Sequence, residues 1–235
     1  MDAPGREADR AAEEGKEDVL MIREPFAYEI DYGRTGEFRQ LLGKLWPDIR
    51  SFLDRNGIRN FSLHQCGQLV FGYGEKQTEE KLPQGEAEAL KGFCDAFLEM
   101  GSFLAAPGEG MDLMYHDIGR VREDKELIRL RVFMTRLKSG CRLEYKRRHD
   151  GLIAARGETV DPGPDSNFTI GHARGYIFGY DEIDTTMEKD ETEEEKAASV
   201  AWETAQLGIM DWITNDVDGM SGLHHPNVQR LAWHL

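Results

Sequence analysis

The chain has 235 residues, of which 40% are hydrophobic, and a formal net charge of -15 at pH 7. This length allows one large domain or two small ones, and a chain so acidic lacks the positive surface that binds nucleic acid. Three scattered cysteines, no export signal and no apolar run of membrane-spanning length predict a cytoplasmic protein with reduced thiols and no membrane association.

The N-terminal third predicts a tail, a strand and a helix. Residues 1–18 hold seven acidic and three basic residues, a net charge of -4, and this composition predicts disorder. Residues 19–30 read as a strand that Pro25 interrupts, because proline cannot donate to a strand ladder. Residues 37–55 carry apolar side chains at helical spacing, with Pro47 inside the pattern.

The next elements complete a first unit over residues 19–117. A hairpin is predicted at residues 60–64 and 69–73, and a second helix at 85–100. A loop around 105–110 then leads to a closing strand at 111–116. The order β-α-β-β-α-β is the split βαβ arrangement of ferredoxin-like folds, so the fold class is α+β.

The same order returns after a linker at 118–125, giving a second unit over residues 126–235. Its predicted parts are a strand at 126–137, a helix at 142–155, a hairpin at 167–181, a helix ending near Ile213 and a strand at 228–234. The run 181–196 contains nine acidic and two basic residues, a net charge of -7. It is interpreted as a solvated insertion before the last helix.

Short motifs recur in the two units with one fixed offset and no gap. Asn60-Phe61-Ser62-Leu63 returns as Asn167-Phe168-Thr169-Ile170, and Phe71-Gly72-Tyr73 returns in the same frame as Phe178-Gly179-Tyr180. Two copies of a complete small domain predict a pseudo-symmetric pair that replaces a homodimer. Whether the fused chain assembles further stays open.

The two copies differ at the first helix. Phe38, Leu41 and Leu42 of the first copy become Tyr145, Arg148 and His149 in the second. Polar groups on a buried helix face are costly unless they are bonded, so their grouping favours a functional pocket. The alternative is a slightly rotated helix, with Arg148 in solvent and His149 bonded to a backbone carbonyl.

The segment Glu144-Tyr145-Lys146-Arg147-Arg148-His149-Asp150 resembles the first-helix signature of the L-rhamnose mutarotase family. The Trp-Pro pair that follows in that family is found only in the first copy, as Trp46-Pro47, while the second copy has Ile153-Ala154. Asn60-Phe61 and Asn167-Phe168 are similar to the family's Asn-Tyr step. The resemblance implies two tandem ferredoxin-like units that form a dimeric α+β barrel within one chain.

It also implies a cofactor-independent mutarotase, which interconverts the α and β anomers of a 6-deoxy monosaccharide such as L-rhamnose or L-fucose. In this interpretation His149 is the acid/base and Tyr145 binds or orients the sugar, at one site in the second unit, and the first unit is a degenerate partner. No metal is expected. The candidates for further sugar contacts are Arg148, Phe168, Trp202 and Trp212. The family's Trp-Trp pair on the second helix is found in neither copy.

Two other functions stay open at this point. The first is a non-catalytic sugar-binding or interaction protein, and the second is another chemistry on the same fold, such as cofactor-free oxygenation or isomerisation. An apolar pocket without hydroxyl-binding groups would favour the latter. His116 and His234 recur at the ends of the closing strands, where a structural role or a role between the halves fits at least as well as catalysis. His224-His225 are interpreted as solvated loop residues.

Overall fold

A computed structural model describes residues 21–78, 80–122, 124–157, 159–160, 162–214 and 228–235. The predicted tail and His224-His225 lie outside these ranges. The first half contains β1 (Ile22–Arg23), β2 (Phe26–Ile30), α1 (Thr35–Arg55), β3 (Arg59–Cys66), β4 (Leu69–Lys76), α2 (Gln84–Phe97), β5 (Gly101–Ala105) and β6 (Asp112–Gly119). The second half contains a short 3-10 helix (Lys125–Leu127), β7 (Ile128–Leu137), α3 (Arg142–Arg156), β8 (Asp165–Ala173), β9 (Tyr176–Asp184), α4 (Glu193–Gln206), β10 (Met210–Trp212) and β11 (Gln229–His234).

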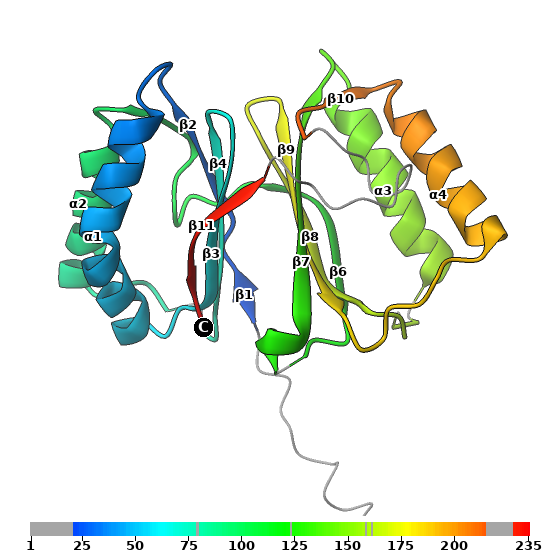
Figure 1. Cartoon of the computed structure of the whole chain (residues 1–235), viewed down its shortest axis with the longest axis horizontal. Helices are drawn as coiled ribbons and strands as arrows, with labels where there is room; N and C mark the ends of the chain where they lie inside the picture. Colours follow the sequence, from blue (N-terminus) through cyan, green and yellow to red (C-terminus); the bar gives the residue numbers. More distant parts are fainter. Residues whose placement is uncertain (1–20, 79, 123, 158, 161, 215–227) are drawn as a thin grey trace, which may run out of the picture.

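These elements form four layers, which confirms the α+β class (Figure 1). Two antiparallel sheets lie face to face in the middle, with α1 and α2 outside one sheet and α3 and α4 outside the other. The first sheet has the order β11-β3-β4-β2-β5, with β1 paired to β4, and the second has the order β10-β7-β9-β8-β6. Each sheet therefore has one face toward the other sheet and one face toward its helices.

The two halves exchange their last strands. The strand β6 of the first half pairs with β8, and β11 at the end of the chain pairs with β3. The expectation that 111–116 and 228–234 close their own units is wrong. Two short strands that the sequence pattern did not predict, β5 and β10, take that place beside β2 and β7. Periodicity identifies a strand but not the edge that it joins.

The acidic run 181–196 is not a separate insertion. Its first residues, Asp181, Glu182 and Asp184, are buried in β9. Its last residues begin α4, where Thr192 and Glu195 form a capping box and three glutamates occupy the first turn. Negative charge at a helix N-terminus is favourable, so much of this charge stabilises the start of α4. The helix ends at Gln206, which places Trp212 on β10 rather than on the helix.

Two local predictions are confirmed. Residues 24–25 separate β1 from β2, as the lone proline predicted. The helix α1 runs through Pro47 and buries Phe38 and Leu42 against the first sheet.

The repeated Asn-aromatic step has a structural reason, because Asn60 and Asn167 have φ values of 48° and 53°. Asparagine tolerates this left-handed region better than most residues, and each marks an irregular register in its strand.

The facing sheets are held together by residues that repeat between the halves. The Phe71 and Phe178 rings stack with centroids 5.5 Å apart, and the Tyr73 and Tyr180 rings stack at 3.7 Å. All four are fully buried, so they form the centre of an apolar core between the sheets. The stacked rings therefore come from equivalent positions of the repeated Phe-Gly-Tyr motif.

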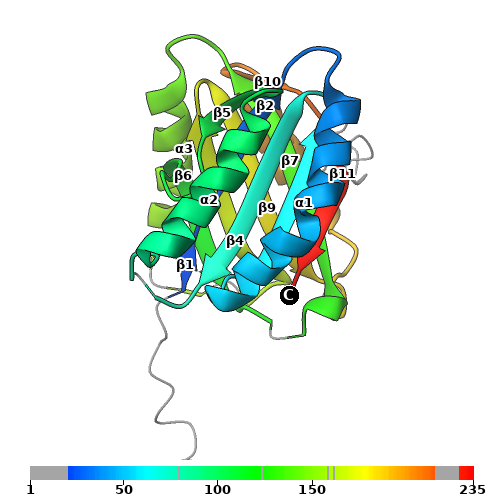
Figure 2. The ribbon, with the colours of Figure 1, turned by 90° about the vertical axis from the view of Figure 1, so that its left-hand side faces the viewer.

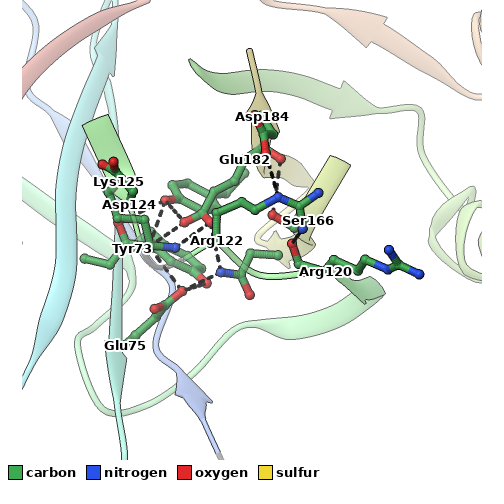
Figure 3. A network of polar contacts seen from close by, with 12 residues as sticks. Tyr73, Glu75, Arg120, Arg122, Asp124, Lys125, Ser166, Glu182 and Asp184 are labelled. Atoms are coloured by element: carbon green, nitrogen blue, oxygen red, sulfur yellow. Dashed lines mark hydrogen bonds and ion pairs between the residues drawn. The ribbon is translucent and has the colours of Figure 1, made fainter. Parts of the chain in front are cut away.

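A buried polar network closes one end of that core (Figure 3). The Tyr73 hydroxyl donates to Glu75 at 2.8 Å, and the Tyr180 hydroxyl donates to Glu182 at 2.9 Å. Lys125 forms an ion pair with Glu182 at 2.6 Å. Burial, reinforced by the adjacent carboxylates, raises the pKa of both tyrosines well above the usual value. Both phenols therefore stay protonated and donate, which keeps the buried glutamates bonded.

The asparagines of the repeated motif connect this network across the halves. Asn60 donates to Glu182 at 2.5 Å, and Asn167 donates to Glu75 at 3.0 Å. Each asparagine thus bonds the glutamate of the other half. The network therefore ties the two sheets together at the same positions that the sequence repeats.

Candidate active site

Equivalent strand positions in the two halves are separated by one constant sequence offset. Phe26 lies opposite Gly72 in the first sheet, and Phe133 lies opposite Gly179 in the second, with the same spacing as the repeated motifs. In both pairs a Cβ at the glycine position would overlap the facing phenylalanine ring and force it to shift. The sequence offset therefore holds in space, and each strand position in one half has a definite counterpart in the other.

The second helices follow a slightly different offset. Their C-terminal turns are marked by the bonds from Met100 N to Phe97 O, 2.9 Å, and from Ile209 N to Gln206 O, 2.8 Å. The backbone amides of Asp31 and Lys138, which are counterparts in the strand frame, donate to Met100 O and Ile209 O respectively. Gln206 is therefore the counterpart of Phe97. The sequence offset between the second helices is slightly longer than the offset between the strands.

In the first half, aromatic rings line the space between the sheet and the helices. Phe38 lies 5.4 Å from Tyr28 and 5.1 Å from Phe97, and the Tyr28 hydroxyl donates to the Phe97 carbonyl at 2.7 Å. Leu42 lies in the same core. This corner has no unsatisfied polar side chain at the four positions, which is the ordinary state of a protein core.

The counterparts in the second half are all polar. Thr135 replaces Tyr28, Tyr145 replaces Phe38, His149 replaces Leu42 and Gln206 replaces Phe97. None of the four is exposed: their relative exposures are 0%, 2%, 5% and 2%. Four buried polar side chains at the positions of an aromatic core form a candidate site.

His149 lies at the centre of an aromatic group from three elements. Its ring centroid is 4.2 Å from that of Tyr145, 5.5 Å from that of Tyr115 and 5.4 Å from that of Trp202. Tyr115 comes from the exchanged strand β6, so a first-half residue completes the second-half site. The His149 cluster is defined as these residues together with the adjoining rings of Phe133, Phe168 and Trp212.

The hydrogen bond of His149 fixes its tautomer. Its Nδ1 lies 2.9 Å from the carbonyl oxygen of Tyr145, one helical turn earlier. A carbonyl only accepts, so Nδ1 carries the proton and Nε2 carries the lone pair. Burial lowers the pKa of His149, although the bond to Tyr145 opposes that shift. The imidazole is therefore neutral at pH 7, with Nε2 able to accept a proton.

Tyr145 is held as a neutral phenol. Its side chain is buried, and its ring stacks against the His149 imidazole. Burial raises its pKa, and the negative charge of Glu203 on α4 raises it further. A buried phenol in this state is a hydrogen-bond donor and not a source of phenolate.

Gln206 is the most unusual residue of the site. Neither its amide nitrogen nor its amide oxygen has a hydrogen-bonding partner within the described part of the chain, and the same is true of the Thr135 hydroxyl. Leaving a buried amide unpaired costs about 1–3 kcal/mol in proteins. The sister half avoids this cost with Phe97. Gln206 is therefore a candidate contact for a polar ligand.

The structure brings five of the six predicted site residues together. The His149 ring contacts the rings of Tyr145 and Trp202, while Phe168 on β8 and Trp212 on β10 belong to the same apolar cluster. The sixth, Arg148, is engaged outside the cluster.

Arg148 connects α3 to its own helix and to α4. Its Nε donates to Glu144 at 2.8 Å and its Nη1 donates to the Ala205 carbonyl at 2.7 Å. Two features of the rotated-helix alternative are thus present, namely this outward arginine and the carbonyl bond of His149. The helix itself is not rotated, since Tyr145 and His149 are both buried.

Sequence reasoning missed Thr135, Gln206, Glu203 and Tyr115, and also an ion pair between Arg131 and Asp181. Arg131 Nη2 lies 2.6 Å from an Asp181 oxygen, and the guanidinium lies over the Phe168 ring at 5.1 Å. The offset of the repeated motifs would have found Thr135 from Tyr28. Gln206 needed the helix offset, and Tyr115 needed the strand exchange.

Two kinds of feature are absent from the part of the chain that the structure describes. The described ranges contain no group of three or more His, Cys, Asp or Glu side chains that could hold a metal ion, and no helix within them is long and apolar enough to cross a bilayer. No protein-family model, curated protein or solved structure matches the chain.

Proposed function

We propose that this chain is a cofactor-independent mutarotase for a 6-deoxy hexose such as L-rhamnose or L-fucose, with one active site in its second half. We also propose that it is a single-chain dimeric α+β barrel of two ferredoxin-like units. The strand order β5-β2-β4-β3 and its counterpart β10-β7-β9-β8 support the fold, because both follow the split βαβ pattern.

One observation carries the function. Four positions that form an aromatic and aliphatic core in the first half are a threonine, a tyrosine, a histidine and a glutamine in the second, and all are buried. Such a replacement costs stability, so it needs a compensating role. A neutral imidazole beside a phenol and an amide suits an uncharged substrate rich in hydroxyl groups.

The proposed reaction needs one proton to move between two oxygens of the sugar. His149 Nε2 takes the proton from the anomeric hydroxyl O1. The C1–O5 bond breaks, its electron pair goes to O5, and O5 takes the proton from Nε2. Because O1 and O5 are both bonded to C1, one imidazole serves both steps. Rotation about C1–C2 and the reverse sequence then give the other anomer.

The remaining residues bind and orient the sugar. The Tyr145 phenol donates to a sugar oxygen, since its raised pKa keeps it protonated. Gln206 and Thr135 supply the unsatisfied donors and acceptors for hydroxyl groups. The rings of Trp202, Phe168 and Trp212 offer apolar faces to the C–H groups and the C6 methyl group. The absence of a hydroxyl at C6 fits a site with this much aromatic surface.

The test is anomer exchange measured by NMR at equilibrium, with L-rhamnose, L-fucose and the 6-hydroxylated D-galactose. The wild-type chain should accelerate exchange of at least one 6-deoxy sugar, and His149→Gln should abolish the acceleration. His172→Gln is the matched control, because His172 lies in the β8–β9 hairpin beside Asp112 and away from the site. No acceleration by the wild type, or equal acceleration by His149→Gln, would contradict the proposal.

A second function has one observation in its favour. The Trp-Trp pair that the resembled family carries on its second helix is found in neither copy, and its loss favours a sugar-binding protein without turnover. Calorimetry separates the two functions: sugar affinity that depends on Gln206, without faster anomer exchange, would establish the binding protein.

A further inference from the structure

A cavity of about 450 Å³ lies in the first half, between the first sheet and the helices α1 and α2. Figure 2 shows these two helices across the strands of that sheet. The cavity occupies the same place in the first half that the His149 cluster occupies in the second. Its walls are mainly aromatic and aliphatic, and include Phe26, Phe38, Leu42, Val70, Leu90 and Phe97.

The interior of this cavity offers few hydrogen bonds to a ligand. The hydroxyl of Tyr28 is already bonded to the Phe97 carbonyl at 2.7 Å. The Cys94 thiol lies at the wall, and burial raises its pKa, so it stays protonated. A sugar would leave its hydroxyl groups unpaired here, at a cost of several kcal/mol for each. The cavity lining contains no histidine, so it suits binding rather than the proton transfer proposed for His149.

Four charged residues line the cavity, two of them acidic and two basic. Glu24 and Lys76 form an ion pair, and Glu80 and Lys81 precede α2. The two positive and two negative charges balance, so the cavity favours neither an anion nor a cation. It can solvate one uncharged polar group of a ligand whose body lies among the rings.

The size limits the ligand. An apolar cavity of roughly 150 Å³ is enough to hold one benzene molecule, so about 450 Å³ is room for two or three rings. Ligand pockets for small molecules begin at about 300 Å³. Facing aromatic walls favour flat rings, through stacked and edge-to-face contacts.

We infer that this cavity is a second binding site, for an uncharged, compact molecule of two or three rings with at most one polar end. The inference does not depend on the proposed mutarotase activity, since the two sites share no catalytic residue. A duplicated chain would then carry two different ligand sites in equivalent places, one polar and one apolar.

The probe is prodan, an uncharged naphthalene dye with one carbonyl end, whose emission shifts to shorter wavelength in apolar surroundings. The wild-type chain should bind it saturably with one dye per chain, and naphthalene should displace it while L-rhamnose should not. Val70→Phe fills the cavity and should weaken binding at least about tenfold. Ile177→Phe is the matched control, because Ile177 is the counterpart of Val70 in the second half.

Leu90→Phe, on the half-buried face of α2, is a second filling variant if Val70→Phe does not fold. Circular dichroism and the melting temperature establish that each variant is folded. The inference is overturned if neither prodan nor naphthalene binds saturably. It is also overturned if folded Val70→Phe and Leu90→Phe bind as tightly as wild type, or if only Ile177→Phe loses binding.

Discussion

Replacing Gln206 with leucine should stabilise the fold and reduce activity at the same time. Gln206 is 2% exposed, and both polar atoms of its amide are unpaired within the described residues. Removing an unpaired buried amide recovers about 1–3 kcal/mol. Leucine has a similar volume and is a good helix former, so the last turn of α4 should persist.

The stability change is measured by urea unfolding. The midpoint should rise with an unchanged slope, and a gain of this size raises the melting temperature of a chain this long by about 2–12 °C. In the anomer-exchange assay, kcat/KM should fall about tenfold, because the substrate loses two hydrogen bonds. The opposite signs distinguish a binding role from simple damage to the fold.

The control is Gln84→Leu, the same chemical change at an exposed residue at the start of α2. It should leave both stability and exchange nearly unchanged. If Gln206→Leu lowers or does not change the free energy of unfolding, the amide is satisfied in solution and the reasoning about the site is refuted. If it stabilises the chain without loss of activity, only the assigned binding role is refuted.

Two further predictions concern stability. Burial, with Arg230 nearby, lowers the pKa of His64 to about 3, so the folded state keeps it neutral while the unfolded chain binds a proton below about pH 6.5. Its contribution is present above pH 6.5 and is lost on acidification, by about 2 kcal/mol between pH 7 and pH 5, and His64→Leu should flatten that part of the pH dependence measured by urea unfolding. Gly179→Ala should destabilise by about 1–3 kcal/mol because its Cβ overlaps Phe133. In contrast, Gly43→Ala in α1 meets open space and should stabilise by up to about 1 kcal/mol, and equal thermal shifts for the two variants would contradict the packing argument.

The asymmetry between the halves suggests how a duplicated fold divides its tasks. The residues that join the sheets are equivalent in both halves, with Tyr73 and Glu75 matched by Tyr180 and Glu182. The residues between sheet and helices are not, as Leu42 and His149 illustrate. Contacts between the halves restrict both copies alike, whereas the two outer compartments are independent and are free to acquire different ligands.

Much of the fold was predictable from local patterns. The helical spacing of Phe38 and Leu42, the interruption at Pro25 and the fixed offset of the Asn-aromatic motif each reflect a local rule of backbone geometry or amphipathic burial. The same offset singled out Tyr145 and His149, since a polar residue stands out only against an apolar counterpart. Composition misled for the acidic run, because Asp181 and Glu182 are buried.

The duplication, the α+β elements and the polar face of α3 follow from the order of the amino acids alone. The strand edges that receive β6 and β11 depend on tertiary packing, because a strand's periodicity fixes its faces but not its neighbour. That exchange brings Tyr115 to His149. Tertiary packing likewise decided that Arg148 bonds α4 while Gln206 is buried in the core, since a helix offers several faces and only its neighbours select one.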